Sequence, residues 1–396
     1  MAANIQPQRS FPIVPATPAP ALRDLRVLHL GKYYPPSRGG IENHLEVLST
    51  ELKEFVRLKL IVANEGRETI SGDCDGVDVT RLGELFKLQS APICPALVRE
   101  VRRQPADIIH VHWPNPAAVL AYLASGCKGK LIFTYHSDVV RQRKMAIAFQ
   151  PILNRALGKA SAIIATSPQY IESSDILSRY REKCRVIPFG VRQEYFAHND
   201  SVAIKKIRNQ YGPNILLSVG RLVYYKGFAH LVRAMASVDA TLLLIGCGPD
   251  AAGLQRLAAE LNIQDRVVFL NEVEDLRPYY HAADMFVLPS IMRSEAFGIV
   301  QLEAMACSKP IINTQLDSGV NFVAPDGVAA LSVPPGNHER LAEAINYLLE
   351  RPYLRTKLGI GGRRRVSEMF TVSGMVQQTL ALYYEVMAKR NEGVRK

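Results

Sequence analysis

The sequence has no long apolar run, few cysteines and a single tryptophan. The longest uninterrupted apolar run, residues 117–124, is far shorter than the roughly 20 residues that a membrane-spanning helix needs. Residues 1–22 lack the charged start and long apolar core of a secretory signal, and their richness in Ala and Pro is typical of a disordered tail. These absences argue against an integral membrane protein and favour a soluble globular one.

The six cysteines lie singly along the chain. They show neither the C-x2-C pairing of zinc sites nor the density of disulfide scaffolds, so we expect a reducing, cytoplasmic setting. The triplet Asp73-Cys74-Asp75 matches the D-x-D pattern that can hold a divalent metal. The neighbouring Gly72 and Gly76 favour a turn before a strand instead. We therefore assign no metal.

What the chain does contain is a repeated alternation of short apolar strands and helical stretches, which is typical of parallel sheets flanked by helices. The length suits two domains, and the alternation starts afresh after a junction between residues 189 and 202. We predict two doubly wound α/β domains, 23–200 and 201–371, with ligands at the carboxyl ends of strands in a cleft between them. Strands are expected at residues 25–30, 58–63, 77–80, 107–111, 130–135, 162–165 and 185–187, and then at 214–219, 240–245, 266–270, 284–288 and 310–313. Helices are expected near 41–54, 96–103, 116–125, 168–179, 228–236, 250–261, 275–282, 297–306, 339–350, 353–368 and 372–388.

The segment 289–310 combines a strand end, a polar loop and an amphipathic helix with two carboxylates. Glu295 falls in the loop or first helical turn, where free backbone N–H groups and the helix dipole attract anions and hydroxyls. Glu303 lies two turns further on. This spacing suits a polyhydroxylated ligand that carries phosphates. The alternative is a capped surface helix with two ordinary glutamates.

Two other loops contain residues of the types that bind phosphate groups. Arg221 and Lys226 lie between a strand end and a helix, where a guanidinium fork and an ammonium can converge on a diphosphate. The alternative is two solvated surface cations. Gly39 and Gly40 open a helix and would let the backbone approach a phosphate or sugar, unless they only form a flexible loop. A further glycine turn, 246–249, is expected beside the Arg221 loop.

Three histidines lie at or near strand ends. His110 and His112 point to the same side of one strand, as a metal pair or, as we favour, as the polar lining of a cleft. His136 follows the next strand, where it can bind a ligand or serve as a structural residue.

The net charge of +11 indicates an anionic partner, which can be nucleic acid, anionic lipid or a phosphorylated substrate. Basic and apolar residues alternate over 141–159, a pattern that suits an amphipathic surface on anionic lipid. Pro151 interrupts this stretch, so two short solvated helices are the alternative. The interleaved aromatic pattern of a nucleic-acid groove is absent. The basic residues of this stretch are Arg141, Arg143, Lys144, Arg155 and Lys159.

Together these motifs resemble the family 4 retaining glycosyltransferases, which have the GT-B fold of two facing Rossmann-like domains, over residues 25–388. The resemblance implies that Arg221 and Lys226 neutralise the leaving nucleoside diphosphate in place of a metal, and that Gly39 and Gly40 approach it. It also implies that the C-terminal helix, 372–396, packs back on the N-terminal domain. Ser308 stands where the family usually has glycine.

For the sugar end of the donor, the resemblance implies that Glu303 binds the ribose diol and that His136 contacts the sugar near the reacting carbon. Glu295 would hold the sugar hydroxyls together with a run of backbone amides. These amides belong to Ala296, Phe297, Gly298 and Ile299.

We therefore expect a metal-independent, retaining glycosyltransferase that needs no cofactor. It would move a hexose, with mannose favoured, from a nucleotide sugar such as GDP-mannose to a glycan or polyprenyl-linked acceptor in polysaccharide biosynthesis. The turn 317–320 resembles the branch of surface-polysaccharide enzymes that often use GDP-mannose. The expected location is the cytoplasm, at the inner membrane face. The alternatives are a sugar-nucleotide epimerase of the same fold and a basic nucleic-acid-binding protein.

Overall fold

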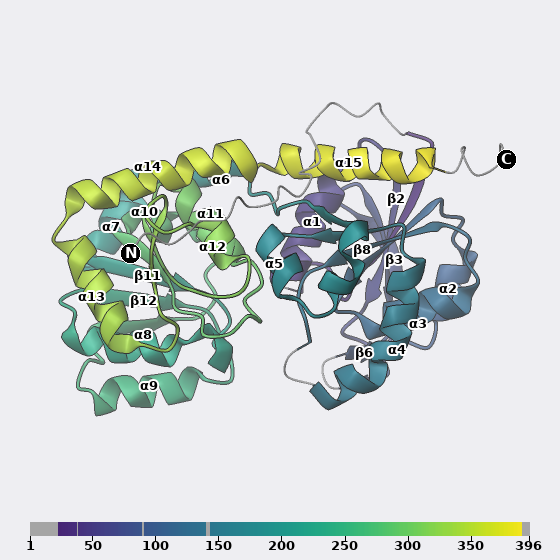
Figure 1. The fold of residues 1–396 in the computed structure, drawn as a ribbon. Helices are drawn as coiled ribbons and strands as arrows, with labels where there is room; N and C mark the ends of the chain where they lie inside the picture. The colour runs from purple at the N-terminus through teal and green to yellow at the C-terminus, as the bar shows by residue number, and fades with distance from the viewer. Residues whose placement is uncertain (1–22, 38, 89–90, 140–142, 390–396) are drawn as a thin grey trace. The chain divides into compact units, whose positions relative to one another are not determined.

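A computed structural model describes residues 23–37, 39–88, 91–139 and 143–389 (Figure 1). The predicted tail 1–22, the basic residue Arg141 and residues 390–396 lie outside this range. The chain forms two compact units: unit 1 contains the residues up to Phe189 and those from Val372, and unit 2 is Gly190–Thr371. Unit 2 begins inside the predicted junction of residues 189–202 and before the predicted boundary at residue 200, and α6 (Gln193–Ala197) packs on α11 (Ile299–Ala306) of this unit.

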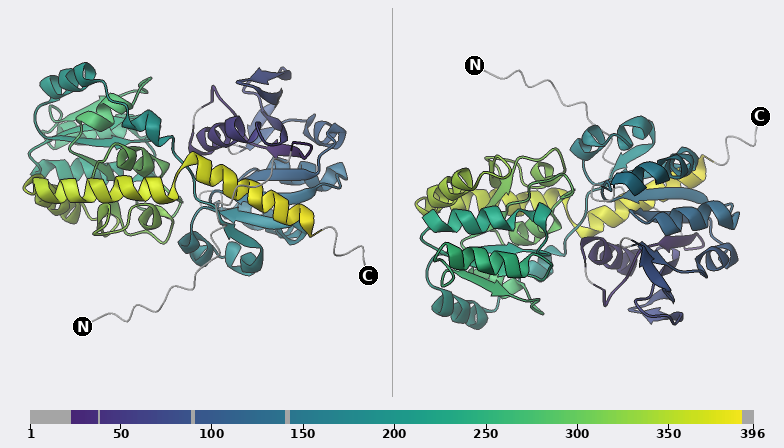
Figure 2. Two further views of the ribbon diagram at one scale, coloured as in Figure 1. Left: turned by 90° about the horizontal axis from the view of Figure 1, so that it is seen from above. Right: turned by 90° about the horizontal axis from the view of Figure 1, so that it is seen from below.

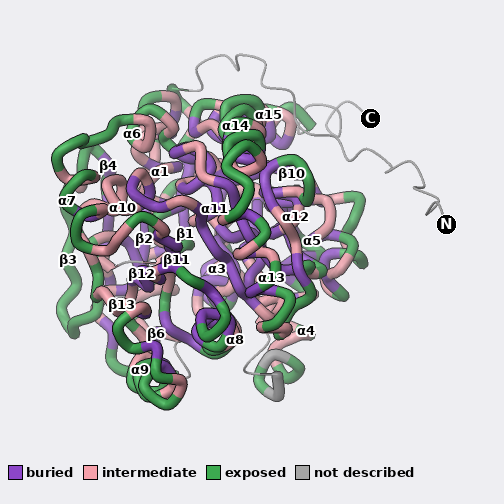
Figure 3. The backbone as a smooth tube through the Cα atoms, turned by 90° about the vertical axis from the view of Figure 1, so that its left-hand side faces the viewer, coloured by how far each residue is buried: buried purple, intermediate pink, exposed green. Residues whose placement is uncertain are grey.

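The sheet of unit 2 has six parallel strands in the order β13-β12-β11-β14-β15-β16. This is the strand order 3-2-1-4-5-6 of a Rossmann unit. Strands β11 and β14 are buried at every residue; Figure 3 shows the burial along the backbone. Helices cover both faces of the sheet, which explains the continuous apolar sequences of these strands. The bounds are β11 Ile215–Val219, β12 Thr241–Ile245, β13 Val267–Leu270, β14 Met285–Leu288, β15 Ile311–Thr314 and β16 Ala330–Val333.

The helices of unit 2 divide between the two faces of its sheet. Leu231 of α8, Leu254 of α9 and Leu341 of α13 share one core cluster with alternate strand residues. Phe286 points to the other face, where its ring lies 5.8 Å from that of Tyr280 in α10. The helix bounds are α7 Ser201–Tyr211, α8 Phe228–Ala234, α9 Ala251–Glu260, α10 Arg277–Ala282, α12 Val320–Val323, α13 His338–Leu349 and α14 Pro352–Met369, with 3₁₀ helices η2 Tyr224–Lys226 and η3 Met235–Ser237.

The sheet of unit 1 has the order β10-β9-β8-β7-β1-β2-β4-β3, and only β3 runs antiparallel to its neighbour. As in unit 2, the strand order reverses next to the first strand, here between β1 and β7. A separate hairpin pairs β5 with β6. The bounds are β1 Arg26–Leu30, β2 Arg57–Ala63, β3 Ile70–Cys74, β4 Val77–Leu82, β5 Phe86–Leu88, β6 Ala91–Ile93, β7 Ile108–Trp113, β8 Lys130–Tyr135, β9 Ala162–Ala165 and β10 Cys184–Val186.

The last helix of the chain, α15 (Val372–Ala388), belongs to unit 1 and lies beside α1 (Gly40–Leu52) (Figure 2). Met375 and Tyr383 of α15 share a core cluster with Leu48 of α1 and with Val27 and Ile108 of the sheet. One face of this sheet is therefore closed by residues from both ends of the chain. The other helices of unit 1 are α2 Leu97–Arg103, α3 Pro116–Ser125, α4 Arg143–Lys159 and α5 Pro168–Ser173, with the 3₁₀ helix η1 Leu177–Lys183.

The structure decides several local predictions. Helix α4 runs through Pro151 instead of breaking into two short helices. Asp73 belongs to β3 and accepts a hydrogen bond from the Gly76 amide, so the D-x-D triplet leads into the β3–β4 hairpin turn. The predicted turn before a strand is thereby confirmed. Ser308 has a left-handed φ of 57°, as expected where relatives have glycine. Among the described residues, no helix has the length and apolar character needed to cross a membrane.

Candidate functional site

The strand order of unit 2 brings two predicted loops together. Strands β11 and β14 are neighbours, although the chain visits β12 and β13 between them. The side chain of Ser218 donates to the Val287 carbonyl at 2.6 Å, and the Ile291 amide donates to the Tyr225 carbonyl at 2.8 Å. The loops after β11 and β14 therefore start side by side at the point where the strand order reverses, which is where such sheets bind ligands.

Lys226 and Glu295 form an ion pair across these two loops. The Lys226 Nζ lies 2.5 Å from a carboxylate oxygen of Glu295, and the side chains are only 12% and 9% exposed. Ser290 donates a hydrogen bond of 3.0 Å to the same carboxylate. Burial alone would lower the pKa of Lys226, but the carboxylate of Glu295 outweighs burial and raises it. Lys226 is therefore held as a cation in a nearly buried position.

Arg221 contributes a second positive charge close to this pair. Its side chain is exposed, and among the residues that the structure describes it has no ion-pair or hydrogen-bond partner. The predicted neighbouring glycine turn lies against it: a Cβ on Gly246 would overlap the Gly220 carbonyl, and one on Gly248 would overlap the Leu222 backbone. Glycine is thus required for the close packing of the two backbones.

The loop after Glu295 leads into the N-terminus of α11. Gly298 precedes the helix with a left-handed φ of 74°. In the first helical turn the Gln301 amide donates to the Gly298 carbonyl at 2.9 Å, whereas the amides of the first residues of a helix, here Ile299 and Val300, have no acceptor within it. The Ala296 carbonyl is anchored by the Gly319 amide at 2.7 Å. The predicted run of amides, from Ala296 through Phe297 and Gly298 to Ile299, thus belongs to the segment that follows Glu295 and enters α11.

Glu303 lies on α11 and is half-buried rather than on a wet helix face. The Tyr280 hydroxyl donates a 2.6 Å hydrogen bond to it. Burial raises the pKa of Glu303 to about 7, even though the Tyr280 hydrogen bond opposes this shift. The carboxylate is therefore close to half-ionised at neutral pH and is poised to accept hydroxyl groups in its charged form.

In unit 1, His110 and His112 do point to the same side of β7, but they do not line a cleft. Both are fully buried, with their rings stacked at 4.7 Å. They belong to a continuous line of hydrogen bonds, here called the histidine chain, whose successive atoms lie 2.7, 2.7, 2.9, 3.0 and 3.1 Å apart. In order, the histidine chain comprises Thr134, His110, Tyr383, His29, His112 and His136.

His136 ends the histidine chain and is 4% exposed. Its Nε2 is bonded to His112, whereas its buried Nδ1 has no hydrogen-bond partner among the described residues. The ring of His44, from α1, lies 5.2 Å away. Gly39 and Gly40 stand at the start of the same helix. The structure therefore places one predicted ligand-binding residue of unit 1 close to the helix that the glycine pair opens.

The clustered histidines are the described residues best suited to hold a metal ion. Two groups of three, which share His112, bring their ring nitrogens within 4.8 Å of one another. Neighbouring nitrogens in the histidine chain, such as those of His29 and His112, are however already at hydrogen-bond distance. Each of these short contacts is therefore explained by a proton shared between the two nitrogens in a hydrogen bond.

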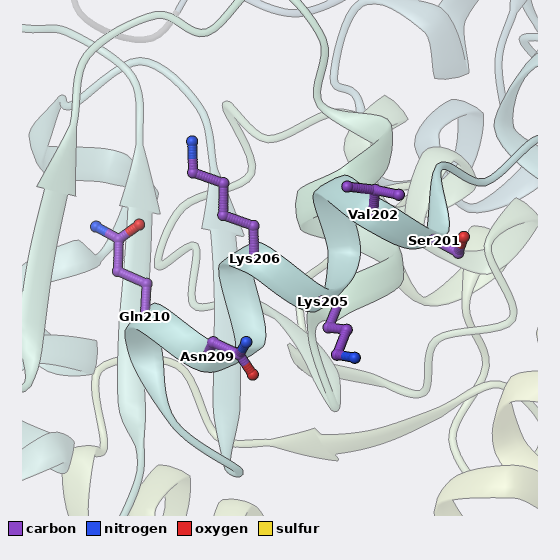
Figure 4. Close-up of a pocket in the computed structure, with 6 residues that line it drawn as sticks. All are labelled: Ser201, Val202, Lys205, Lys206, Asn209 and Gln210. Atoms are coloured by element: carbon purple, nitrogen blue, oxygen red, sulfur yellow. The ribbon is translucent and has the colours of Figure 1, made fainter.

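Three residues that contact the candidate site or the histidine chain were not predicted from the sequence. Ser290 and Tyr280 hold the two glutamates, and Tyr383 joins the histidines from the far end of the chain. Only Ser290 has a local signal in the sequence, since it lies two residues after the end of a strand. A shallow hollow of about 690 Å³ also lies on α7, but it contains none of the predicted site residues (Figure 4). It is lined by Ser201, Val202, Lys205, Lys206, Asn209 and Gln210.

Comparison with known proteins identifies the family. The profile of Glycosyltransferase Family 4 matches residues 38–195, and that of Glycosyl transferases group 1 matches residues 200–365. The O-antigen chain mannosyltransferase C of Escherichia coli is 31% identical over 373 residues, which cover 93% of this chain and all of that protein. The chain belongs to glycosyltransferase family 4. The resemblance inferred from its motifs is thereby confirmed, and this protein is a glycosyltransferase.

Two further similarities extend this result. The D-rhamnosyltransferase WbpZ of Pseudomonas aeruginosa is 34% identical to this glycosyltransferase over 268 residues, 67% of this chain and 70% of that protein. The crystal structure of Anabaena Alr3699/HepE in complex with UDP and glucose has a TM-score of 0.77 at 20% identity, and covers 91% of this chain and 99% of that one. The fold is GT-B, as the sequence predicted.

Proposed function

We propose that this family 4 glycosyltransferase transfers mannose from GDP-mannose, with retention of configuration and without a metal ion, to a glycan or polyprenyl-linked acceptor in polysaccharide biosynthesis. The observation that carries the proposal is the buried Lys226–Glu295 pair at the switch point of unit 2, beside the exposed Arg221. Two cations and one carboxylate at this position suit a diphosphate joined to a sugar.

The charges of the site suggest how a donor is held. A diphosphate brings negative charge to Lys226 and Arg221, and Glu295 is then free to accept hydrogen bonds from sugar hydroxyls. As the bond to the sugar breaks, negative charge grows on the diphosphate, so the two cations stabilise the transition state more than the bound donor. Because protein cations fill this role, the proposal needs no metal.

The carboxylates support retention without an enzymatic nucleophile. Glu295 is held between Lys226 and Ser290, which suits a binding role. Glu303 is tied to Tyr280 and is assigned to the ribose diol. We propose that the diphosphate itself takes the proton of the acceptor on the face from which it leaves.

The donor sugar is inferred from the relatives. One is named as a mannosyltransferase and another as a D-rhamnosyltransferase. D-rhamnose is mannose without its 6-hydroxyl, so the two sugars have the same arrangement of the ring hydroxyls at C2, C3 and C4. This shared arrangement favours mannose as the transferred sugar. The guanine base follows from the resemblance of the turn 317–320.

The test is a panel of sugar nucleotides that includes GDP-mannose, GDP-D-rhamnose and UDP-glucose, each with and without EDTA. GDP-mannose is expected to raise the melting temperature most and to be consumed in both conditions. NMR of the product is expected to show the α-anomer retained. Preference for a UDP-sugar, loss of activity with EDTA, or conversion of the donor into another sugar nucleotide without an acceptor would contradict the respective part of the proposal.

We also propose that the enzyme works in the cytoplasm and meets the inner membrane face through α4. Met145 and Ile147 are 41% and 61% exposed at one end of this helix, and Arg155 and Lys159 are exposed at the other. Flotation with liposomes tests this contact. Binding should require anionic lipid and should weaken in Arg155→Gln/Lys159→Gln, whereas equal binding to neutral liposomes would refute it.

A further inference from the structure

The histidine chain has a consequence for the proton on His136. The four histidines are buried, and burial lowers the pKa of each imidazole well below its ordinary value, to about 3 for His112. At neutral pH each ring is therefore neutral and carries one proton. A neutral imidazole donates through one nitrogen and accepts through the other, so the protons along the histidine chain must all run in one direction.

Thr134 decides which direction is favoured. If the protons run away from Thr134, its hydroxyl donates to His110, and every later member donates to the next. If they run toward Thr134, His110 donates to the hydroxyl oxygen, and the Thr134 proton needs another acceptor. Within the described structure Thr134 Oγ1 contacts only His110, and the residue is 1% exposed. The second direction therefore leaves two buried groups unsatisfied, the Thr134 hydroxyl as a donor and His136 Nδ1 as an acceptor. The first direction leaves only the Nδ1–H donor of His136, so it costs less.

The two directions give opposite forms of His136. When Thr134 donates, His136 accepts through Nε2 and carries its proton on Nδ1, the nitrogen that has no partner in the structure. When the direction is reversed, the same Nδ1 is a bare acceptor. We propose that the histidine chain runs from the Thr134 hydroxyl to His136 and so fixes His136 as a hydrogen-bond donor, through Nδ1, to an oxygen atom of the substrate.

This inference rests on the proposed function for the identity of the substrate, and it makes Thr134 and Tyr383 positioning residues. Tyr383 is essential to the relay because, in the described part of the chain, its hydroxyl is the one group that joins His110 to His29, at 2.7 and 2.9 Å. Its hydroxyl accepts from one ring and donates to the other. The C-terminal helix α15 thus acts on a residue at the end of β8 without touching the substrate.

The direct test is the tautomer of each histidine in the ligand-free protein, measured by NMR after ring-¹⁵N labelling. If the protons run from Thr134, all four histidines of the histidine chain carry the proton on Nδ1, the less common form of free histidine in water. If they run the other way, all four carry it on Nε2. The remaining five histidines are assigned by single substitutions. Four Nδ1–H signals support the proposal, and Nε2–H signals or a mixture overturn it.

Two substitutions at one position provide matched variants. Thr134→Ser keeps the hydroxyl and should keep the wild-type tautomers. Thr134→Val keeps the shape but removes the donor, so a mixture of both tautomers is expected. An unchanged spectrum in Thr134→Val would refute the role of Thr134. Melting curves of both variants establish whether they are folded. If Thr134→Val does not fold, the wild-type spectrum still decides the direction of the protons.

Activity with GDP-mannose provides a separate readout. When half of the molecules hold the wrong tautomer, kcat should fall about twofold in Thr134→Val and stay unchanged in Thr134→Ser. If the tautomers are as proposed but no sugar nucleotide binds or reacts, the proposed function fails and the direction of the histidine chain stands. If GDP-mannose is used but the tautomers are reversed, the proposed function stands and this inference fails.

Discussion

Replacing Glu295 with glutamine removes one charge of the buried ion pair while keeping the size of the side chain. Lys226 then remains nearly buried without a counterion. Removing one partner of a buried pair costs roughly 3–5 kcal/mol. We take about 3 kcal/mol, since both side chains keep slight exposure. For a unit of about 180 residues, each kcal/mol lowers the melting temperature by about 2–4 °C. The expected loss in Glu295→Gln is therefore about 6–12 °C.

The assay is thermal unfolding followed by circular dichroism, with two comparison variants. Ser290→Ala removes only the hydrogen bond to Glu295 and should cost about 1 kcal/mol. The double variant Lys226→Met/Glu295→Leu removes both charges and should melt near the wild-type temperature, because apolar residues often replace a buried ion pair without loss of stability. It should nevertheless be inactive. A Glu295→Gln protein that melts like wild type, or a double variant less stable than Glu295→Gln, would refute the reasoning.

Four further predictions concern the same unit. Burial raises the pKa of Glu303 to about 7, and the proposed ribose contact needs the charged carboxylate. GDP-mannose should therefore bind up to about tenfold more weakly for each pH unit below 7. Glu303→Gln should abolish this pH dependence in calorimetric titrations. The folded state holds this proton to higher pH than the unfolded chain, so stability should fall as pH rises from about 4.5 to 7, and Glu303→Gln should flatten that slope in denaturant titrations. Lys226→Ala should lower kcat about 10²-fold or more, with a smaller effect on donor affinity because Arg221 remains; unchanged turnover would refute the role of Lys226. Gly227→Ala should destabilise, since a Cβ would overlap the Pro289 carbonyl and φ is 70°, whereas the matched Gly253→Ala, in open space on α9, should gain up to about 1 kcal/mol. Equal melting temperatures of these two glycine variants would contradict that comparison.

The sequence was most informative where local pattern and burial agree. Strand β8 and helix α15 have the predicted bounds, because a continuous apolar strand and a helical apolar stripe leave little choice of structure. Helix α7 was missed: it buries only Ile207, so its apolar pattern is weak, although Asp200 caps it. Strand β16 was also missed, because Ser332 interrupts its apolar sequence and only its two end residues are buried.

Residues of the candidate site were predicted by type and position, but their partners were not. The pairing of Lys226 with Glu295 depends on β11 lying next to β14, and no local pattern encodes that adjacency. The spacing of His110 and His112 correctly indicates that they share a side. Their burial depends on Tyr383, which arrives from the other end of the chain.

The position of α15 also has a consequence for synthesis on the ribosome. Domains generally fold as they emerge, with the N-terminal one first. Here the core of unit 1 includes Val372, Met375 and Tyr383, which are translated after the whole of unit 2. Unit 2 can thus complete its core while unit 1, though made earlier, still lacks a helix. The nascent chain should therefore finish its two units in the reverse of the order in which they begin, and chains terminated before Val372 should expose the unfinished face to chaperones and proteases.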